Sequence, residues 1–398
     1  MKPSLFKRLQ LERIIDALLP LIAVIGALLV GAVVLILLDT NPVEAYTAMF
    51  TGAFANKNGL ADTMVKAIPL LLVGLGIVIA FRANVINIGA EGQLIVGALI
   101  STYLAVELGE TWPNYIVIIL CIMAGTLMGG LWAGIPGYLK AYLNVNEILS
   151  TIMMNQIAIQ IGFFLLRGPM IDPKELEAGT NIPHSARLPR PTDLPRFTDI
   201  AQWFGFTESA KDLNITGFQG EIYGLLVEPT RLHMGFFIAI LMAILVYIFL
   251  WRTTIGYRIR AVGLNPAAAR YAGIQVPRTI ILSMALSGAF AGLAGAVEIL
   301  GLHHRMFEPL AVSAGYGFSG IVVALFGKLH PIGAIPASIL FGGLLVGGDK
   351  MQRAVQVPQV FVTMLLGLIV LFVVSSEIWS RRRARRRVST QTTAEENA

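Results

Sequence analysis

The sequence predicts an all-α, polytopic membrane protein with about ten transmembrane helices, some of them short or broken, and a long extracytoplasmic loop. Hydrophobic residues make up 56% of the 398 residues and charged residues 14%, against about 25% charged residues in a soluble domain. The apolar residues gather in runs near the ~20 residues that a helix needs to cross a bilayer. This composition argues against a water-soluble enzyme and excludes a disordered chain.

The first predicted span is the uncharged run 17–38. It is longer than the ~7–15 apolar residues of a signal peptide, and a polar turn follows it in place of a cleavage site, so we expect it to be retained. Glycines and prolines in the shorter later runs favour broken or bundle-buried helices. Nine further spans are predicted after the first one. They are 65–81, 92–108, 115–135, 147–165, 232–250, 279–300, 316–327, 332–347 and 358–376.

The distribution of basic residues predicts the orientation. The N-terminus 1–16, the tail 377–398 with its six arginines, and the loop 251–278, which has no acidic residue, are all basic. Ten spans place both termini on one side, and basic segments favour the cytoplasm. We interpret the tail as an anchor on anionic lipid rather than a nucleic-acid site, because no nucleic-acid module accompanies it.

The predicted domain organisation follows from these spans. The first five helices lie within 17–165, and the last five lie within 232–376. The segment 166–231 between them is a long loop expected on the extracytoplasmic side. A loop of this length usually has a purpose. It caps the outer mouth or contacts a partner, or it is a passive insertion, and the sequence leaves these alternatives open.

A polar stretch separates the second and third spans. Asn84, Asn87 and Glu91 have the spacing of one helix face, but Gly89 and Gly92 favour a break there. Broken backbone at membrane depth is tolerated beside protein or a water-filled cavity. We interpret the stretch as the lining of a translocation path; the alternative is a re-entrant turn whose polar groups satisfy one another. Within that turn, Glu91 could pair with Arg82 or with backbone N–H groups.

Polar residues also interrupt the span 147–165, where Asn155, Gln156 and Gln160 occur. Hydrogen bonds to neighbouring helices are the favoured interpretation of such residues. Glycine pairs with GxxxG spacing predict close helix packing. These pairs are Gly125/Gly129, Gly130/Gly134, Gly288/Gly292 and Gly343/Gly347.

The basic loop 251–278 contains the signals of a short helix. Asn265 is a good N-cap, Pro266 suits the first helical position, and Gly273 is a good terminator. We expect about two turns of helix there. It docks into a groove of a soluble partner or rests on anionic lipid, and the residues alone do not decide between the two.

No enzyme signature is visible in the sequence. Gly327-Lys328 is followed by Leu329, so it is not a phosphate-binding loop, and ATP would have to bind another chain. His303, His304 and Glu308 lack the spacing of a zinc protease. We therefore expect no catalytic residue, no metal and no cofactor in this chain.

Four segments resemble the permease subunits of ATP-binding cassette (ABC) importers of the branched-chain amino acid/simple sugar superfamily, and nucleoside-importer permeases match best. The similarity runs from about residue 60 to residue 375. The segments are NIGAEGQ at 87–93, NEILSTIMMN at 146–155, RAVGLNPAAARYAGI at 260–274 and GYGFSGIVVALFG at 315–327.

The resemblance implies a set of partners in the inner membrane. These are a second, similar permease, two ATPase subunits that hold ATP and Mg²⁺, and an extracytoplasmic substrate-binding protein. The implied substrate pathway comprises Asn84, Asn87, Glu91, Gln93, Asn155, Gln156, Phe318 and Ser319. The implied ATPase-coupling residues are Gly263, Leu264, Asn265, Pro266, Ala268, Ala269, Arg270 and Gly273. A sugar or branched-chain amino acid importer is the alternative, and an ion-coupled transporter or an intramembrane enzyme is a remote one.

Overall fold

A computed structural model describes residues 22–372 except 181, 207, 209–211, 214, 216 and 359, and also residue 375. The basic N-terminus 1–16 and the basic tail 377–398 lie outside the described residues, as does the start of the first predicted span. The regular elements of the described residues are helices. The described residues also form one isolated β-bridge, between Arg196 and His233. This architecture agrees with the predicted all-α class.

Ten apolar helices of the described residues follow the ten predicted spans in order. Eight of them are long and apolar enough to cross a membrane, and the shorter helices Ile22–Leu37 and Val360–Phe372 occupy the first and last positions. The eight are α3 (Lys57–Arg82), α4 (Ala90–Leu108), α5 (Asn114–Leu143), α6 (Glu147–Arg167), α10 (Gly235–Arg252), α13 (Val276–Glu298) with the π-helix η2 (Ile299–His303), α14 (Pro309–Ser313) with α15 (Tyr316–Phe326), and α16 (Pro331–Val355).

Several boundaries differ from the apolar runs because capping residues set them. The second span starts eight residues early, since Asn56 caps α3 by accepting the N–H of Gly59 at 2.7 Å. The fourth continues to Leu143, where Asn144 adopts a left-handed conformation. The predicted span 316–327 is only the second part of a helix pair that starts at Pro309.

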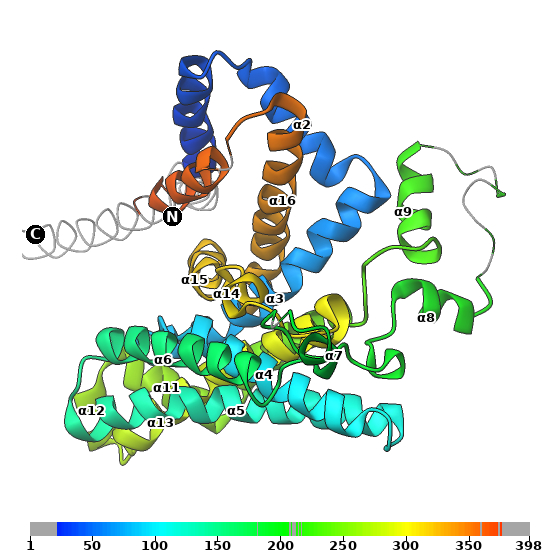
Figure 1. Ribbon diagram of the computed structural model, residues 1–398. Helices are drawn as coiled ribbons and strands as arrows, with labels where there is room; N and C mark the ends of the chain where they lie inside the picture. The colour runs from blue at the N-terminus through cyan, green and yellow to red at the C-terminus, as the bar shows by residue number, and fades with distance from the viewer. Residues whose placement is uncertain are drawn as a thin grey trace, which may run out of the picture. The chain divides into compact units, whose positions relative to one another are not determined.

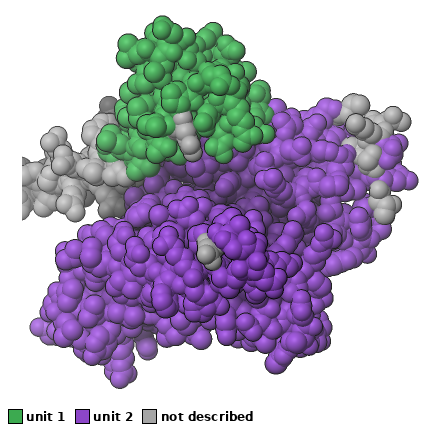
Figure 2. Space-filling model, viewed as in Figure 1, with its two compact units in different colours: residues 1–52, 347–398 green, residues 53–346 purple. Residues whose placement is uncertain are grey.

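The chain divides into two compact units, residues 1–52 with 347–398 and residues 53–346 (Figure 2). In the first unit, the hydroxyl of Tyr46 on α2 (Pro42–Phe54) donates to the carbonyl of Leu28 at 2.6 Å. In the second unit, α5 and α13 pack with their backbones in contact. A Cβ on Gly292 would lie 2.2 Å from the carbonyl oxygen of Gly125, and one on Gly288 would lie 2.3 Å from that of Gly129. The close packing predicted for these two glycine pairs is thus confirmed.

Different segments of the chain pack at the two ends of α13. At its start lie α11 (Thr254–Leu264) and α12 (Pro266–Tyr271). At its far end, the backbone N–H groups of Leu188 and Leu194 donate to the carbonyls of His304 and Leu300, both at 2.8 Å. The long loop therefore covers the end of α13 opposite α12 (Figure 1). The loop has its own helices, which are α7 (Pro173–Glu177), η1 (Arg190–Thr192), α8 (Phe197–Trp203) and α9 (Gly217–Val227).

Candidate functional site

The predicted break between the second and third spans is present. Helix α3 ends at Arg82 and α4 starts at Ala90. Asn84 adopts a left-handed conformation with φ 58°, its N–H donates to Phe81, and the next N–H, of Val85, donates to the carbonyl of Ala80. This pattern is a Schellman motif, in which asparagine is an accepted left-handed residue. Asn84 therefore ends α3, and its side chain is exposed rather than turned towards the other polar residues.

Asn87 lies at the centre of the break and is completely buried. Its Nδ2 donates to Oε1 of Gln93 and to Oγ of Ser287 on α13, both at 2.9 Å. Its Oδ1 accepts from the N–H of Gly89 at 2.9 Å and from Nε2 of Gln93 at 3.1 Å. An asparagine amide offers two donor hydrogens and two acceptor positions. All are used here, so this conformation ties the break to α4 and α13 and leaves no amide position for a substrate.

Asn155 on α6 completes the other side of the break. Its Oδ1 accepts from the N–H of Gly92 at 2.9 Å, and its Nδ2 donates to the carbonyl of Ile88 at 3.0 Å. Gly92 is in the first turn of α4, where N–H groups lack helical partners. Asn155 thus caps a neighbouring helix, and the favoured packing interpretation agrees with these contacts. Gln156, the next residue, is exposed on a different side of α6.

Glu91 joins two helix starts. It belongs to the first turn of α4, and its carboxylate accepts from the N–H groups of Gly315 at 3.1 Å and Gly317 at 2.7 Å, at the start of α15. The positive ends of both helices favour this carboxylate. Gly315 itself has φ 72°, and a Cβ on Gly317 would lie 2.3 Å from the backbone nitrogen of Glu91. The two glycines therefore permit a contact that larger residues would prevent.

The alternative ion pair between Arg82 and Glu91 is not formed. The Arg82 guanidinium donates twice to the carbonyl of Leu329, at 3.1 and 2.8 Å, and lies over the ring of Trp251 at 5.2 Å. Arg260 of α11 lies over the same ring at 5.8 Å. Sequence reasoning missed this cluster; its one local signal was an aromatic residue directly before Arg252 at the end of a span.

Four of the predicted pathway residues therefore come together, and four do not. Asn87, Glu91, Gln93 and Asn155 are buried around the start of α4. Asn84 and Gln156 are exposed elsewhere, and on the first turn of α15 Phe318 is 51% exposed and Ser319 half-buried. Converging N-termini of broken helices offer N–H groups and partial positive charge, as transporter sites do. A role for these residues along a substrate path stays a prediction.

The predicted short helix is present as α12. Oδ1 of Asn265 accepts from the N–H of Ala268 at 3.1 Å, and Gly273 follows the helix with φ 80°. Ala269 packs into a small apolar cluster with Val262 and Val276. The remaining predicted coupling positions of α12, Pro266, Ala268 and Arg270, are exposed. One face of α12 is thus anchored, and the other is open.

Two large apolar side chains flank this open face. Leu264, before α12, is 89% exposed, and Tyr271, its last residue, is 96% exposed. Gly263 lies against the end of α3, where a Cβ would be 2.0 Å from the carbonyl oxygen of Arg82. The predicted coupling segment, residues 260–274, therefore touches Arg82, the residue at which the break begins.

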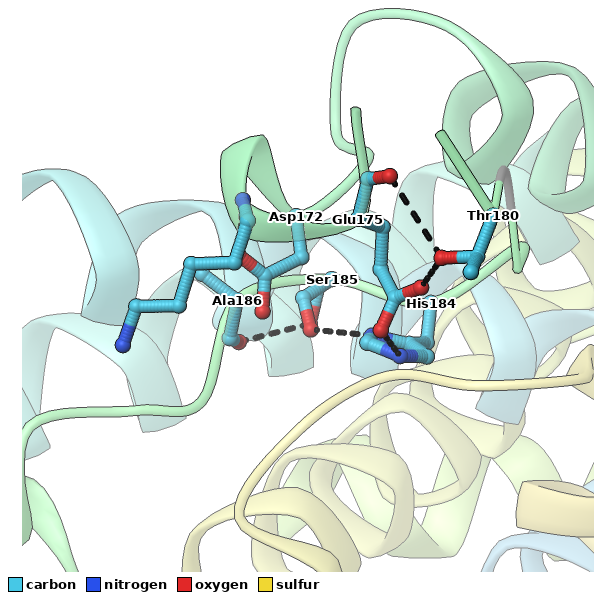
Figure 3. Close-up of polar contacts among 7 residues, drawn as sticks. Asp172, Glu175, Thr180, His184, Ser185 and Ala186 are labelled. Atoms are coloured by element: carbon cyan, nitrogen blue, oxygen red, sulfur yellow. Dashed lines mark hydrogen bonds and ion pairs between the residues drawn. The ribbon is translucent and has the colours of Figure 1, made fainter. Parts of the chain in front are cut away.

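The loop end of the structure is held by polar contacts (Figure 3). Nε2 of His184 pairs with Oε1 of Glu175 at 3.1 Å, and the hydroxyl of Thr180 donates to the same carboxylate. The hydroxyl of Ser185 donates to the carbonyl of Ala186 at 2.9 Å and also accepts the N–H of Met306 at 2.9 Å. The bond between Ser185 and Met306 fixes the loop onto the segment that follows α13 and η2, and the other bonds hold the loop together internally.

His303 and His304, whose spacing argues against a zinc site, have separate acidic partners. Nδ1 of His304 lies 2.8 Å from Oδ1 of Asp193, and Nε2 of His303 lies 3.4 Å from Oε2 of Glu298. Within the described part of the chain, no three histidine, cysteine or acidic side chains are placed to hold a metal ion.

Comparison with known proteins shows the family to which the chain belongs. Residues 59–374 match the family described as the permease component of branched-chain amino acid transport systems. The guanosine ABC transporter permease protein NupP of Bacillus subtilis (strain 168) is 35% identical over 92% of this chain and 95% of its own length. The nucleoside ABC transporter permease protein NupB of Lactococcus lactis subsp. cremoris is 31% identical, over 89% of this chain and 90% of its own.

A sugar permease is similar to the same degree. A glucose ABC transporter permease protein of Haloferax volcanii is 34% identical over 92% of this chain and 88% of its own length. No solved structure matches the chain.

Proposed function

The chain belongs to the family of permease components of branched-chain amino acid transport systems, and from this premise we propose that it forms the nucleoside pathway of an ABC importer. It is a multi-pass membrane protein, as its family and its apolar helices indicate. The ATPase subunits of such an importer supply the energy and hold ATP and Mg²⁺. This chain binds no cofactor or metal and performs no catalysis.

The exposed face of α12 carries the proposal. Leu264 and Tyr271 are large side chains that lie almost fully in solvent at the end of the bundle opposite the loop, where they are available to a partner. Between them lies a short, well-capped helix. We assign the exposed residues Leu264, Pro266, Ala268 and Tyr271 to docking in a groove of the ATPase subunit. Arg270 lines a neighbouring pocket and lies at the edge of this face.

This docking site fixes the proposed orientation. The ATPase is cytoplasmic, so α12 and both termini face the cytoplasm and residues 166–231 face outwards. The substrate-binding protein docks on that outer loop, and a second, homologous permease completes the pathway. Basic residues of the tail rest on anionic lipid.

The contact between Gly263 and Arg82 would transmit movement of the ATPase to the substrate pathway. The backbone of Gly263 lies against that of Arg82, so a displacement of α11 and α12 pushes on the end of α3 and on the break that follows. Rearrangement of the Asn87 and Glu91 hydrogen bonds would then open the start of α4 and α15 to the substrate. Nucleosides offer hydroxyls and ring nitrogens, which suit the N–H groups and carbonyls of broken helices.

The substrate class is tested with the partner binding protein. We expect it to bind guanosine and other nucleosides, measured by titration calorimetry, and not to bind glucose. The Haloferax volcanii relative makes glucose the second candidate, and preferential glucose binding would establish that candidate instead.

The outer loop is tested by docking. Replacing residues 207–216 with a short glycine-serine linker leaves the contacts of His184, Ser185 and Leu188 intact. Weaker docking of the binding protein is expected. Unchanged affinity would identify this part of the loop as a passive insertion.

A further inference from the structure

A long apolar groove runs between α5 and α13 in the second unit, with Met242 of α10 beside it. Its volume is about 1260 Å³, above the ~300–1,000 Å³ of small-molecule pockets. On α5 it extends from Leu120 to Leu139, about 28 Å along the helix axis. That length approaches the ~30 Å hydrocarbon thickness of a bilayer.

The lining offers almost nothing to a polar ligand. One stripe along α5 consists of the exposed side chains of Met123, Leu127, Leu131 and Ile135. The hydroxyl of Thr126 is already used, since it donates to the carbonyl of Ile122 at 2.6 Å. A hydrophilic substrate therefore gains nothing in this groove, whereas hydrocarbon chains match it.

A second, smaller pocket adjoins the groove at its α12 end. It has a volume of about 370 Å³ and is lined by Tyr142, Arg270 and Arg278 among others. Tyr138 lines the groove and Tyr142 lines the pocket, and their ring centroids are 5.0 Å apart. The two spaces are therefore neighbours, close enough for the headgroup and the acyl chains of one lipid to lie in them together.

The pocket is positively charged, and no acidic side chain of the described residues neutralises its two arginines. Neither Arg270 nor Arg278 forms an ion pair with any residue that the structure describes. Lys140, also near this end of α5, pairs with Glu147 at 2.8 Å. The loop 251–278 contains no acidic residue. A phosphate is the group that two free guanidinium groups at the end of an apolar groove would complement.

We propose that this composite site binds an anionic phospholipid, with its phosphate at Arg270 and Arg278 and its acyl chains in the adjoining half of the groove. A second copy of the chain is a poorer occupant. A two-fold contact would set this patch against the same patch of the other copy, and the loop 251–278 has no acidic residue to neutralise its arginines. The lipid would hold α12 at a fixed depth through the start of α13.

The test counts lipids on the purified full-length protein by native mass spectrometry, with phosphatidylglycerol and phosphatidylcholine offered at equal concentration. Arg278→Gln removes one arginine, and Arg258→Gln is its control, since Arg258 is exposed on the same loop but outside the pocket.

Gly134→Leu fills the groove, because a Cβ at Gly134 meets no atom within 4 Å. Gly367→Leu is its control, as Gly367 is equally open and lies on another helix.

The proposal expects wild type to retain phosphatidylglycerol in preference to phosphatidylcholine. Arg278→Gln should weaken this binding about fivefold, the ratio expected for one basic residue at an anionic surface, and Gly134→Leu should also weaken it. Both controls should bind like wild type. Equal retention of the two lipids, or undiminished binding in Arg278→Gln, overturns the proposal. So does a Gly134→Leu variant that loses its subunit pairing while its lipid count stays unchanged, which would identify the groove as a protein interface.

Discussion

The carboxylate of Glu91 on α4 accepts a 2.7 Å hydrogen bond from the backbone N–H of Gly317 on α15, 226 residues further along the chain. Its second oxygen accepts from Gly315 at 3.1 Å. One side chain therefore joins the starts of two broken helices. Because these N–H groups have no other helical partner, the geometry makes Glu91 important for folding of the polar break.

The substitution Glu91→Gln tests this structural role. Glutamine has one acceptor oxygen and no charge, so one N–H at the start of α15 loses its partner. We expect a loss of about 1–3 kcal/mol in stability, seen as a lower melting temperature in detergent. Glu44→Gln is the control, because Glu44 lies exposed in the first turn of α2. An unchanged melting temperature with altered uptake would place Glu91 on the substrate path instead.

Asn87→Ala tests whether the break belongs to the pathway. The variant leaves the side-chain amide of Gln93 and the N–H of Gly89 short of partners, so we expect lower stability. We also expect uptake to fall further than the amount of folded protein. Ser287→Ala removes only one of the partners of Asn87 and serves as the comparison. Full uptake by Asn87→Ala would remove this stretch from the pathway hypothesis.

Gly263→Ala tests the contact between the coupling segment and α3. A Cβ at Gly263 would lie 2.0 Å from the carbonyl oxygen of Arg82, so the two backbones must separate. We expect destabilisation of about 1–3 kcal/mol, as for overpacked cores, and weaker coupling of ATP hydrolysis to uptake. Gly134→Ala, which adds a methyl group in open space, should behave like wild type. Wild-type coupling in both variants would show that this contact does not transmit movement.

His233 predicts a pH dependence of stability. Burial, and then the charges of His304 and Arg196, lower its pKa to about 3, whereas the unfolded chain has the ordinary value near ~6.5. Below pH ~6.5 the unfolded state therefore binds more protons, and stability falls as the pH falls from about 6.5 towards 3. Above that range His233 contributes no slope.

The measurement is the melting temperature at pH 7 and pH 4.5 for wild type and His233→Gln. The pairs of His304 with Asp193 and of His303 with Glu298 remain in both proteins. The variant, which cannot titrate at this position, should lose less stability on acidification. Equal losses in the two proteins would mean that His233 is not buried in its neutral form.

The sequence predicted those features that depend on neighbouring residues. Apolar runs gave the ten helices, Gly89 and Gly92 indicated the break, and Asn265 with Pro266 indicated α12. The sequence could not reveal partners that lie far away in the chain, such as Ser287 for Asn87, 200 residues apart. For the same reason it did not show that Gln156 and Phe318 are exposed and lie outside the buried cluster. Such pairings depend on helix packing, which leaves no local pattern.

The central claim is that this chain moves nucleosides under the control of an ATPase docked at α12. The most direct measurement is uptake of labelled guanosine by proteoliposomes that contain the permease pair, the ATPase subunits and the binding protein, with wild type compared with Ala268→Asp. Ala268 is exposed on α12, so the aspartate should leave folding intact and put a charge into the docking contact. We predict ATP-dependent uptake by wild type and its loss in the variant, with Ala268→Ser active. Full ATP-dependent uptake by Ala268→Asp, or wild-type uptake driven by an ion gradient without the ATPase, would contradict the account.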